Sequence, residues 1–123
     1  MATGTALSDF LEDALLDHII ATYTTTKVHL FTAAPTDAGG GTEVSGGSYV
    51  AQNVTLVNNG DGTAENTAEI DFGTATASWG TVTHFAIKDG ANFLFWGALD
   101  TSKAIDIGDG AKFVAGEIVV ALD

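Results

Sequence analysis

Few residues in this sequence have a type and spacing that could perform chemistry. There is no cysteine, which excludes thiolate catalysis, disulfides and cysteine-ligated metals. His18, His29 and His84 stand far apart, without the short spacing of a zinc site. Ser45 is no nucleophile elbow, because Glu43 stands where that motif requires glycine. We therefore expect no catalytic residue, no cofactor and no metal site.

Carboxylates are numerous, but their pattern is typical of wet surfaces and turns. Glu69 and Asp71 alternate with Ile70 and Phe72, as expected of a sheet with one solvated face. Residues 58–63, Asn-Asn-Gly-Asp-Gly-Thr, form the strongest turn signal in the chain. A structural cation held by this turn stays open as an alternative, although the segment departs from the EF-hand template at its sixth and twelfth positions.

Aromatic side chains are the remaining candidates for a functional surface. Trp79, Phe85, Phe93, Phe95 and Trp96 cluster within 18 residues of the sequence. Core packing is the default interpretation, because aromatics dominate β cores. The alternatives are a subunit interface and a platform for carbohydrate. The candidate interface residues, two of them from a predicted helix, are Trp79, Phe93, Phe95, Leu11 and Leu15.

One helix precedes the strands that must position these residues. Apolar side chains recur at helical spacing near the start of the chain, and Ser8 is a suitable N-cap. The pattern predicts a helix over about residues 8–20. Its apolar stripe, which we expect to be buried against a sheet, includes Leu7, Leu11, Leu15 and Ile19. The alternative is that this stripe docks on a partner.

From Lys27 onward the sequence has the pattern of short strands separated by turns. The glycine-rich segment 38–48 predicts a long loop. Residues 93–99 are nearly all apolar and predict a central strand buried on both faces. Eight or nine strands and one helix indicate a mainly β fold, an antiparallel β-sandwich with a jelly-roll-like arrangement. The length predicts that residues 1–123 form a single domain.

The charge balance limits the partners of the chain. Sixteen carboxylates against four lysines give a net charge of −12, and arginine is absent. Such a surface repels phosphate and anionic lipid, so we expect no nucleic-acid partner. The sequence contains no apolar run long enough to span a membrane, and its first residues lack the positive region of a secretory signal. We expect synthesis in a cytoplasm and no membrane partner.

Five blocks of the sequence are distinctive: residues 7–18, 30–49, 75–85, 96–99 and 115–117. The most specific stretches run from Pro35 to Tyr49 and from Trp79 to Phe85. Together the blocks resemble a family of small tailed-phage virion proteins that is often described as tail-fibre-like. The chain departs from that family at Val50-Ala51-Gln52, where Ala-Arg-Gln is frequent.

The resemblance implies a non-enzymatic structural role in the virion, on the particle exterior. Two locations stay open: the capsid, as a decoration, cement or head-fibre subunit, and the tail, as a fibre or tail-tip component that adheres to host carbohydrate. Both imply association with copies of the chain itself, for which analogy suggests a trimer. They also imply contact with other virion proteins, such as the major capsid protein or tail proteins.

Overall fold

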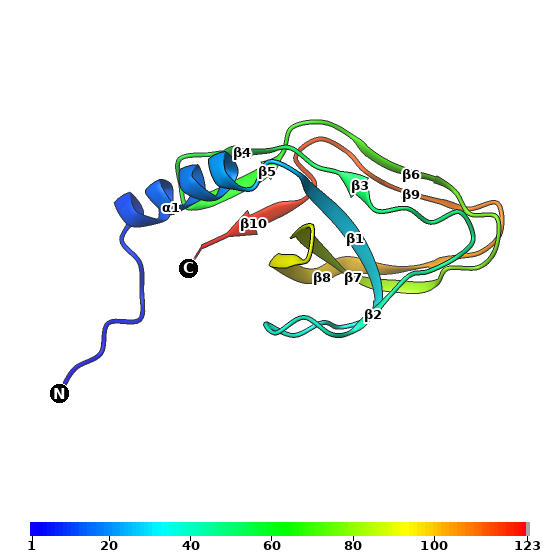
Figure 1. The fold of residues 1–123 in the computed structure, drawn as a ribbon, viewed down its shortest axis with the longest axis horizontal. Coiled ribbons are helices and arrows are strands. Elements are labelled where there is room, and N and C mark those ends of the chain that lie inside the picture. The colour runs from blue at the N-terminus through cyan, green and yellow to red at the C-terminus, as the bar shows by residue number, and fades with distance from the viewer. Residues whose placement is uncertain (123) are drawn as a thin grey trace.

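The chain forms one helix followed by ten short strands over the described residues (Figure 1). The structure, a computed structural model, describes residues 1–122. The helix is α1 (Asp9–Thr22), close to its expected range. The strands are β1 (Thr26–Ala33), β2 (Thr42–Glu43), β3 (Gln52–Asn53), β4 (Leu56–Asn58), β5 (Thr63–Asn66), β6 (Ile70–Thr74), β7 (Gly80–Asp89), β8 (Asn92–Ile105), β9 (Gly110–Phe113) and β10 (Val119–Ala121).

The strands form three sheets, and every named pair is antiparallel. The largest sheet has the order β2-β1-β7-β8, and β3 also pairs with β1. A second sheet has the order β10-β5-β4, and the third is the pair β6-β9. The sheets do not close into a barrel. The prediction of a mainly β, antiparallel fold with one N-terminal helix is confirmed.

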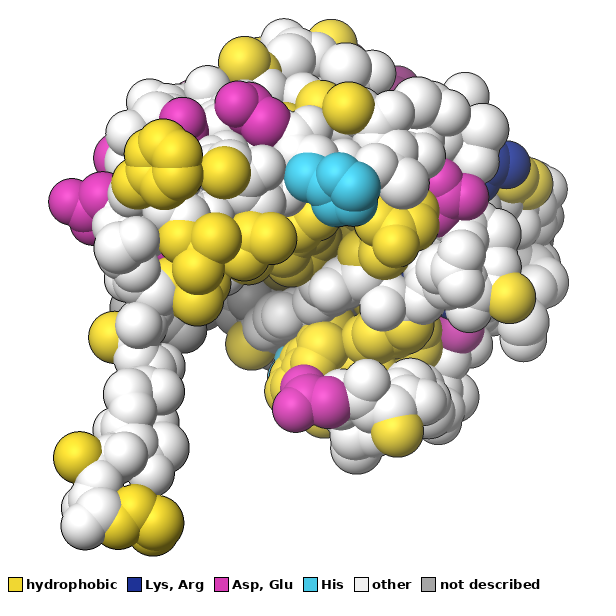
Figure 2. Space-filling view, turned by 60° about the vertical axis from the view of Figure 1, so that its left-hand side comes forward, with side chains coloured by type: hydrophobic (Ala, Val, Ile, Leu, Met, Phe, Trp, Pro, Cys, Tyr) yellow, Lys and Arg dark blue, Asp and Glu magenta, His cyan; other side chains and the backbone are white. Residues whose placement is uncertain are grey.

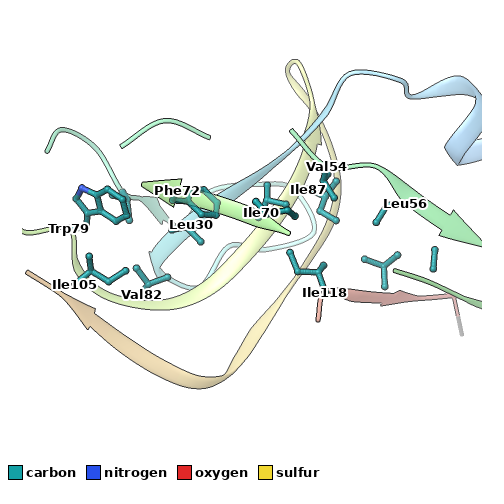
Figure 3. Packing of buried hydrophobic residues seen from close by; sticks show 14 of the residues in the cluster. Leu30, Val54, Leu56, Ile70, Phe72, Trp79, Val82, Ile87, Ile105 and Ile118 are labelled. Carbon is teal, nitrogen blue, oxygen red and sulfur yellow. The ribbon is translucent and has the colours of Figure 1, made fainter. Parts of the chain in front are cut away.

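The core is a continuous cluster of apolar side chains from all three sheets and the helix. On β1, Val28 and Leu30 point into the core, whereas Lys27, which precedes Val28 on the same strand, is exposed. On β6, Ile70 and Phe72 are buried and Asp71 is exposed, as the alternation predicted. Figure 3 shows how these side chains gather between the strands. The fully buried members of this cluster with less than 2 % exposure include Leu16, Val28, Leu30, Ala64, Val82, Ile87 and Ile105.

The expectation for residues 93–99 was wrong, because they lie in β8, at an edge of the largest sheet. An edge strand has a neighbour on one side only, so its side chains stay half-buried, and Trp96 is 40 % exposed. The strand is 14 residues long. Its pairing with β7 jumps from Val82↔Lys103 to His84↔Ala98, so residues 99–102 bulge out of register. Such bulges keep a long open edge from pairing with other chains along its whole length.

Two stretches of the chain pass from one strand to another in a different sheet. Residues 49–57 contain β3 and β4, and residues 64–72 contain β5 and β6, which belong to different sheets. Asn66 lies at the second break with 1 % exposure. Its side-chain amide donates to the carbonyls of Ala68 and Val114, and its carbonyl accepts the backbone N–H of Ile118. These bonds satisfy the backbone where the chain leaves one sheet for the other.

Among residues 1–122, no helix is long and apolar enough to cross a bilayer.

Candidate functional site

The helix presents only part of its predicted apolar stripe to solvent. The hydroxyl of Ser8 accepts the backbone N–H of Leu11 at 3.2 Å, which confirms the N-cap. The side that packs on β4 carries Glu12 and Leu16, both buried. On the opposite side Phe10 is 83 % exposed, Leu11 41 % and Leu15 36 %. The expectation that Leu11 and Leu15 are buried against a sheet was therefore wrong, whereas Leu7 and Ile19 are half-buried.

The physical reason is that this helix has apolar residues on both sides. Leu16 and Ile20 form a second apolar row, and they pack against the core. We call the outward row the helix stripe. It consists of Phe10, Leu11, Ala14, Leu15, His18 and Ala21, all exposed. Large exposed apolar groups gathered on one face of a soluble protein mark an interaction surface.

A segment without charged side chains leads into the helix stripe. Residues 1–8, which we call the N-terminal arm, contain no Asp, Glu, Lys or Arg. Figure 1 shows the arm leading away from the body of the molecule. Residues 1–6 are exposed throughout. Figure 2 shows hydrophobic side chains along the arm and on the face of the body above it. Arm and stripe together leave hydrophobic side chains uncovered at this end of the molecule.

The turn at residues 58–63 holds the helix in this orientation. The side-chain amide of Asn58 donates to the carboxylates of Asp13 at 2.8 Å and Asp17 at 2.9 Å. Gly62 has φ +85°, and a Cβ there would collide with the carboxylate of Glu12. The turn joins β4 to β5, which confirms its reading as a hairpin turn.

Two side-chain oxygens of this turn accept hydrogen bonds within the protein. Asn58 Oδ1 accepts the backbone N–H of Gly60 at 2.8 Å. Asp61 Oδ1 accepts both the hydroxyl and the backbone N–H of Thr63, and these bonds lower the pKa of Asp61. Within the described part of the chain, no group of three or more His, Asp or Glu side chains is placed to hold a metal ion. The geometry supports a turn that braces the helix.

The aromatic interface candidates do not form one surface. Trp79 is 4 % exposed and lies in the core, where its indole N–H donates to the carbonyl of Gly47 at 2.9 Å. Trp79 is therefore a core residue of this chain, and its ring has no exposed face through which a partner could contact it. Phe95 packs partly against the core. Phe93 is half-buried opposite Lys88 on β7. Of the five candidates, Leu11 and Leu15 alone share an exposed face.

Trp96 is an exposed aromatic that was not among the interface candidates. Its indole N–H donates to the carboxylate of Asp37 at 3.0 Å, and the ring of His84 lies 6.3 Å away. Asp37 belongs to the loop that follows Pro35, so this bond fixes the loop over the outer face of the largest sheet. The indication in the sequence was the alternation in β8, where Phe95 and Trp96 point to opposite faces.

A polar trio of His29, Glu43 and Tyr49 was missed by sequence analysis. One carboxylate oxygen of Glu43 lies 2.7 Å from His29 Nδ1 and accepts the hydroxyl of Tyr49 at 2.8 Å. The Tyr49 hydroxyl also accepts the backbone N–H of Leu30 at 2.9 Å. Burial raises the pKa of Tyr49, and the bond to Glu43 acts in the same direction. The trio ties the glycine-rich segment to β1, so the expected loop is anchored at its centre.

The comparison with known protein families decides what kind of protein carries these surfaces. The family model described as podophage GP4 fiber I protein gp80 matches residues 6–121. The chain belongs to this family. A search of curated proteins finds no match. Membership of a phage fibre family makes the chain a structural protein of a phage virion, as the resemblance implied.

Proposed function

We propose that this fibre-family protein is a non-enzymatic subunit on the exterior of the phage particle, a capsid decoration, cement or head-fibre subunit. Its N-terminal arm and helix stripe form the end at which it assembles with copies of itself and on the particle, and its β body projects outward as one domain. Its partners are copies of itself and other virion proteins, such as the major capsid protein. The observation that carries the proposal is the 83 % exposure of Phe10 beside Leu11 and Leu15.

Burial and charge support assembly through this end. The core contains sixteen buried residues without any member of the helix stripe. Covering one large apolar side chain stabilises a complex by roughly 1.5–3 kcal/mol. The net charge of −12 opposes loose association of the acidic body with itself and keeps it soluble. An exposed apolar face on an acidic body is the arrangement expected of a subunit that is anchored at one end.

Particles that lack the protein provide the direct test. Purified chain is added to such particles, and the added density is located by cryo-electron microscopy. We expect density on the capsid exterior with the wild type and with Val57→Asp, and none with Phe10→Asp. Val57 is a matched control, since it is 45 % exposed but lies on β4, outside the stripe. Density at the tail alone, or equal binding of Phe10→Asp, would overturn the proposal.

Trp96 supports a second candidate, a tail fibre or tail-tip component that adheres to host carbohydrate. A half-exposed indole ring beside Asp37 and His84 combines an apolar surface with polar groups, as small-ligand sites do. Adsorption of the labelled protein to host cells tests this candidate. Trp96→Ala is expected to abolish adsorption, whereas Ile107→Ala, at another exposed apolar position, is expected to leave it intact. Equal adsorption of both variants would exclude the Trp96 platform.

A further inference from the structure

The helix stripe has the spacing of a helix-to-helix seam. Leu11, Ala14, His18 and Ala21 follow one another at intervals of three, four and three residues. This is the spacing, 3.5 residues on average, by which helices pack along a shared seam. All four side chains are exposed. The side of the helix that covers its own domain carries a separate apolar row, Leu16 and Ile20, so packing on the core does not account for the outward row.

The stripe is also free of charge over a wide arc. At 3.6 residues per turn, the helix surface from Phe10 round to Leu15 spans about 140°. No Asp, Glu, Lys or Arg of the helix falls within this arc. Asp13 and Asp17 lie beyond one border, where the amide of Asn58 binds both. Glu12 faces the packed side.

These charges identify the occupant of the stripe. A partner with a basic surface would find no carboxylate on the arc to pair with. An acidic partner would find no lysine or arginine there. A second copy of this chain matches the arc with an equally uncharged arc. It does so while the carboxylates of both helices stay at the borders or on the packed sides. Since each molecule carries −12, this is a face on which two copies can meet with little repulsion.

We propose that copies of the chain associate by packing their helix stripes together, parallel and in register. This inference rests on the proposed function, in which the chain is an assembled subunit. Parallel packing places Leu11 against Leu11 and His18 against His18, with a layer of Ala14 between them that lets the backbones approach. Leu16 already holds the helix on the body, so association does not have to order a free peptide.

The N-terminal arm completes the interface. A helix of 14 residues is about 21 Å long and offers only two heptads. A stable interface covers roughly 800 Å² on each partner, more than so short a seam supplies. The arm joins the stripe at its Leu11 end, has no charged side chain and is exposed over residues 1–6. Its residues extend the seam beyond the helix and add apolar contact from Leu7 and Met1.

A single introduced cysteine tests the seam, because the natural chain has none. Under mild oxidation, Leu11→Cys is expected to give a disulfide-linked pair on a non-reducing gel, in high yield and at low protein concentration. Val57→Cys has a similar exposure, 45 % against 41 %, and is expected to stay unlinked. An unlinked Leu11→Cys, or equal linking of both variants, would overturn parallel, in-register packing.

Sedimentation measures the association directly. The wild type is expected to sediment as an oligomer, and Leu11→Asp to associate at least tenfold more weakly, with Val57→Asp unchanged. Circular dichroism confirms that each variant is folded. A monomeric wild type that still adds to depleted particles would overturn the seam and leave the proposed function standing. An oligomer linked through Leu11→Cys that binds no particle would support the seam and overturn the proposed function.

Discussion

The side-chain amide of Asn58 donates a 2.8 Å hydrogen bond to the carboxylate of Asp13, joining the β4–β5 turn to the helix. The same amide donates to the backbone carbonyl of Asp13 and to Asp17. Since Asn58 is fixed on β4, these bonds select the rotation of the helix about its axis. Leu16 then points into the core and the helix stripe points outward.

Removing this amide is expected to loosen the helix. Asn58→Ala should lower the free energy of unfolding by about 1–2 kcal/mol, because a part-buried hydrogen-bonded group loses its partners. Urea denaturation followed by circular dichroism measures the change. Asn53→Ala, on an exposed position of β3, is the control and should change stability by less than about 0.5 kcal/mol. Equal stability of the two variants would show that Asn58 does not brace the helix.

The two tryptophans differ in burial, and replacing each of them compares a core residue with a surface residue. Trp79→Ala removes a ring that is 4 % exposed and should lower the free energy of unfolding by about 3–5 kcal/mol. Trp96→Ala removes a ring that is 40 % exposed and should cost distinctly less. Each variant keeps one tryptophan, so fluorescence follows unfolding in both. A folded Trp79→Ala that fails only in assembly would return Trp79 to the interface.

Tyr49 is expected to make stability fall at alkaline pH. Burial raises the pKa of its hydroxyl above the ordinary value near 10, the bond to Glu43 adds to this, and the N–H of Leu30 opposes it. The unfolded chain therefore loses this proton at lower pH than the folded chain does. The contribution is complete below about pH 10 and declines as pH rises further.

The comparison with Tyr49→Phe isolates this group. At pH 8 the variant should be less stable by about 1 kcal/mol, because the hydroxyl makes two hydrogen bonds. Between pH 8 and pH 11 the difference between the two proteins should shrink. Lysine titration is common to both and cancels. A difference that stays constant over this range would mean that Tyr49 ionises equally in both states.

Local patterns made much of the fold predictable. Ser8 before an apolar repeat located the helix, and the Asn-Gly and Asp-Gly pairs located the β4–β5 turn. Local patterns could not predict which face of each element is buried or what it packs against. Leu11 and Leu16 are both apolar, and only tertiary contacts, such as the bonds of Asn58 and the packing of Leu16 on the core, decide which of them is buried. Likewise a run of apolar residues indicates a strand but not whether it is central or, like β8, at an edge.

The candidate site was predictable to the same limited extent. Leu11 and Leu15 were among the candidates because of their spacing, and they share the exposed face. Phe10 was not among them, although it is more exposed than either of them, at 83 %. The polar trio joins Glu43 to His29, 14 positions away, and to Tyr49, and the Tyr49 hydroxyl reaches the backbone N–H of Leu30, 19 positions away. Such pairings require the sheet register.

Removal of metal ions is expected to change stability little. The oxygens of Asn58 and Asp61 at the turn accept hydrogen bonds from Gly60 and Thr63. In the presence of a chelator, the melting midpoint should therefore move by less than about 4 °C, which corresponds to under 1 kcal/mol for a domain of this size. A loss above about 10 °C, reversed by added calcium, would reveal a structural cation at this turn.

Alanine substitutions at Gly47 and at its neighbour Gly46 allow the effect of backbone strain to be distinguished from that of a steric collision. Both have positive φ, +59° at Gly47 and +75° at Gly46, so an alanine at either position is strained by about 1–2 kcal/mol. A Cβ on Gly46 meets open space, but one on Gly47 would lie 2.8 Å from the carbonyl of Ala77 and from the indole nitrogen of Trp79. That approach would also disturb the bond from Trp79 to the Gly47 carbonyl.

Gly47→Ala is therefore expected to destabilise the protein clearly more than Gly46→Ala, by at least a further 1 kcal/mol. Removal of a buried hydrogen bond alone accounts for a loss of about this size. Thermal unfolding should show two separated midpoints, that of Gly47→Ala the lower, because each kcal/mol moves the midpoint by about 4–8 °C. If both variants melt together, the segment before Tyr49 must shift easily, and the close contact with Trp79 is not needed to hold it.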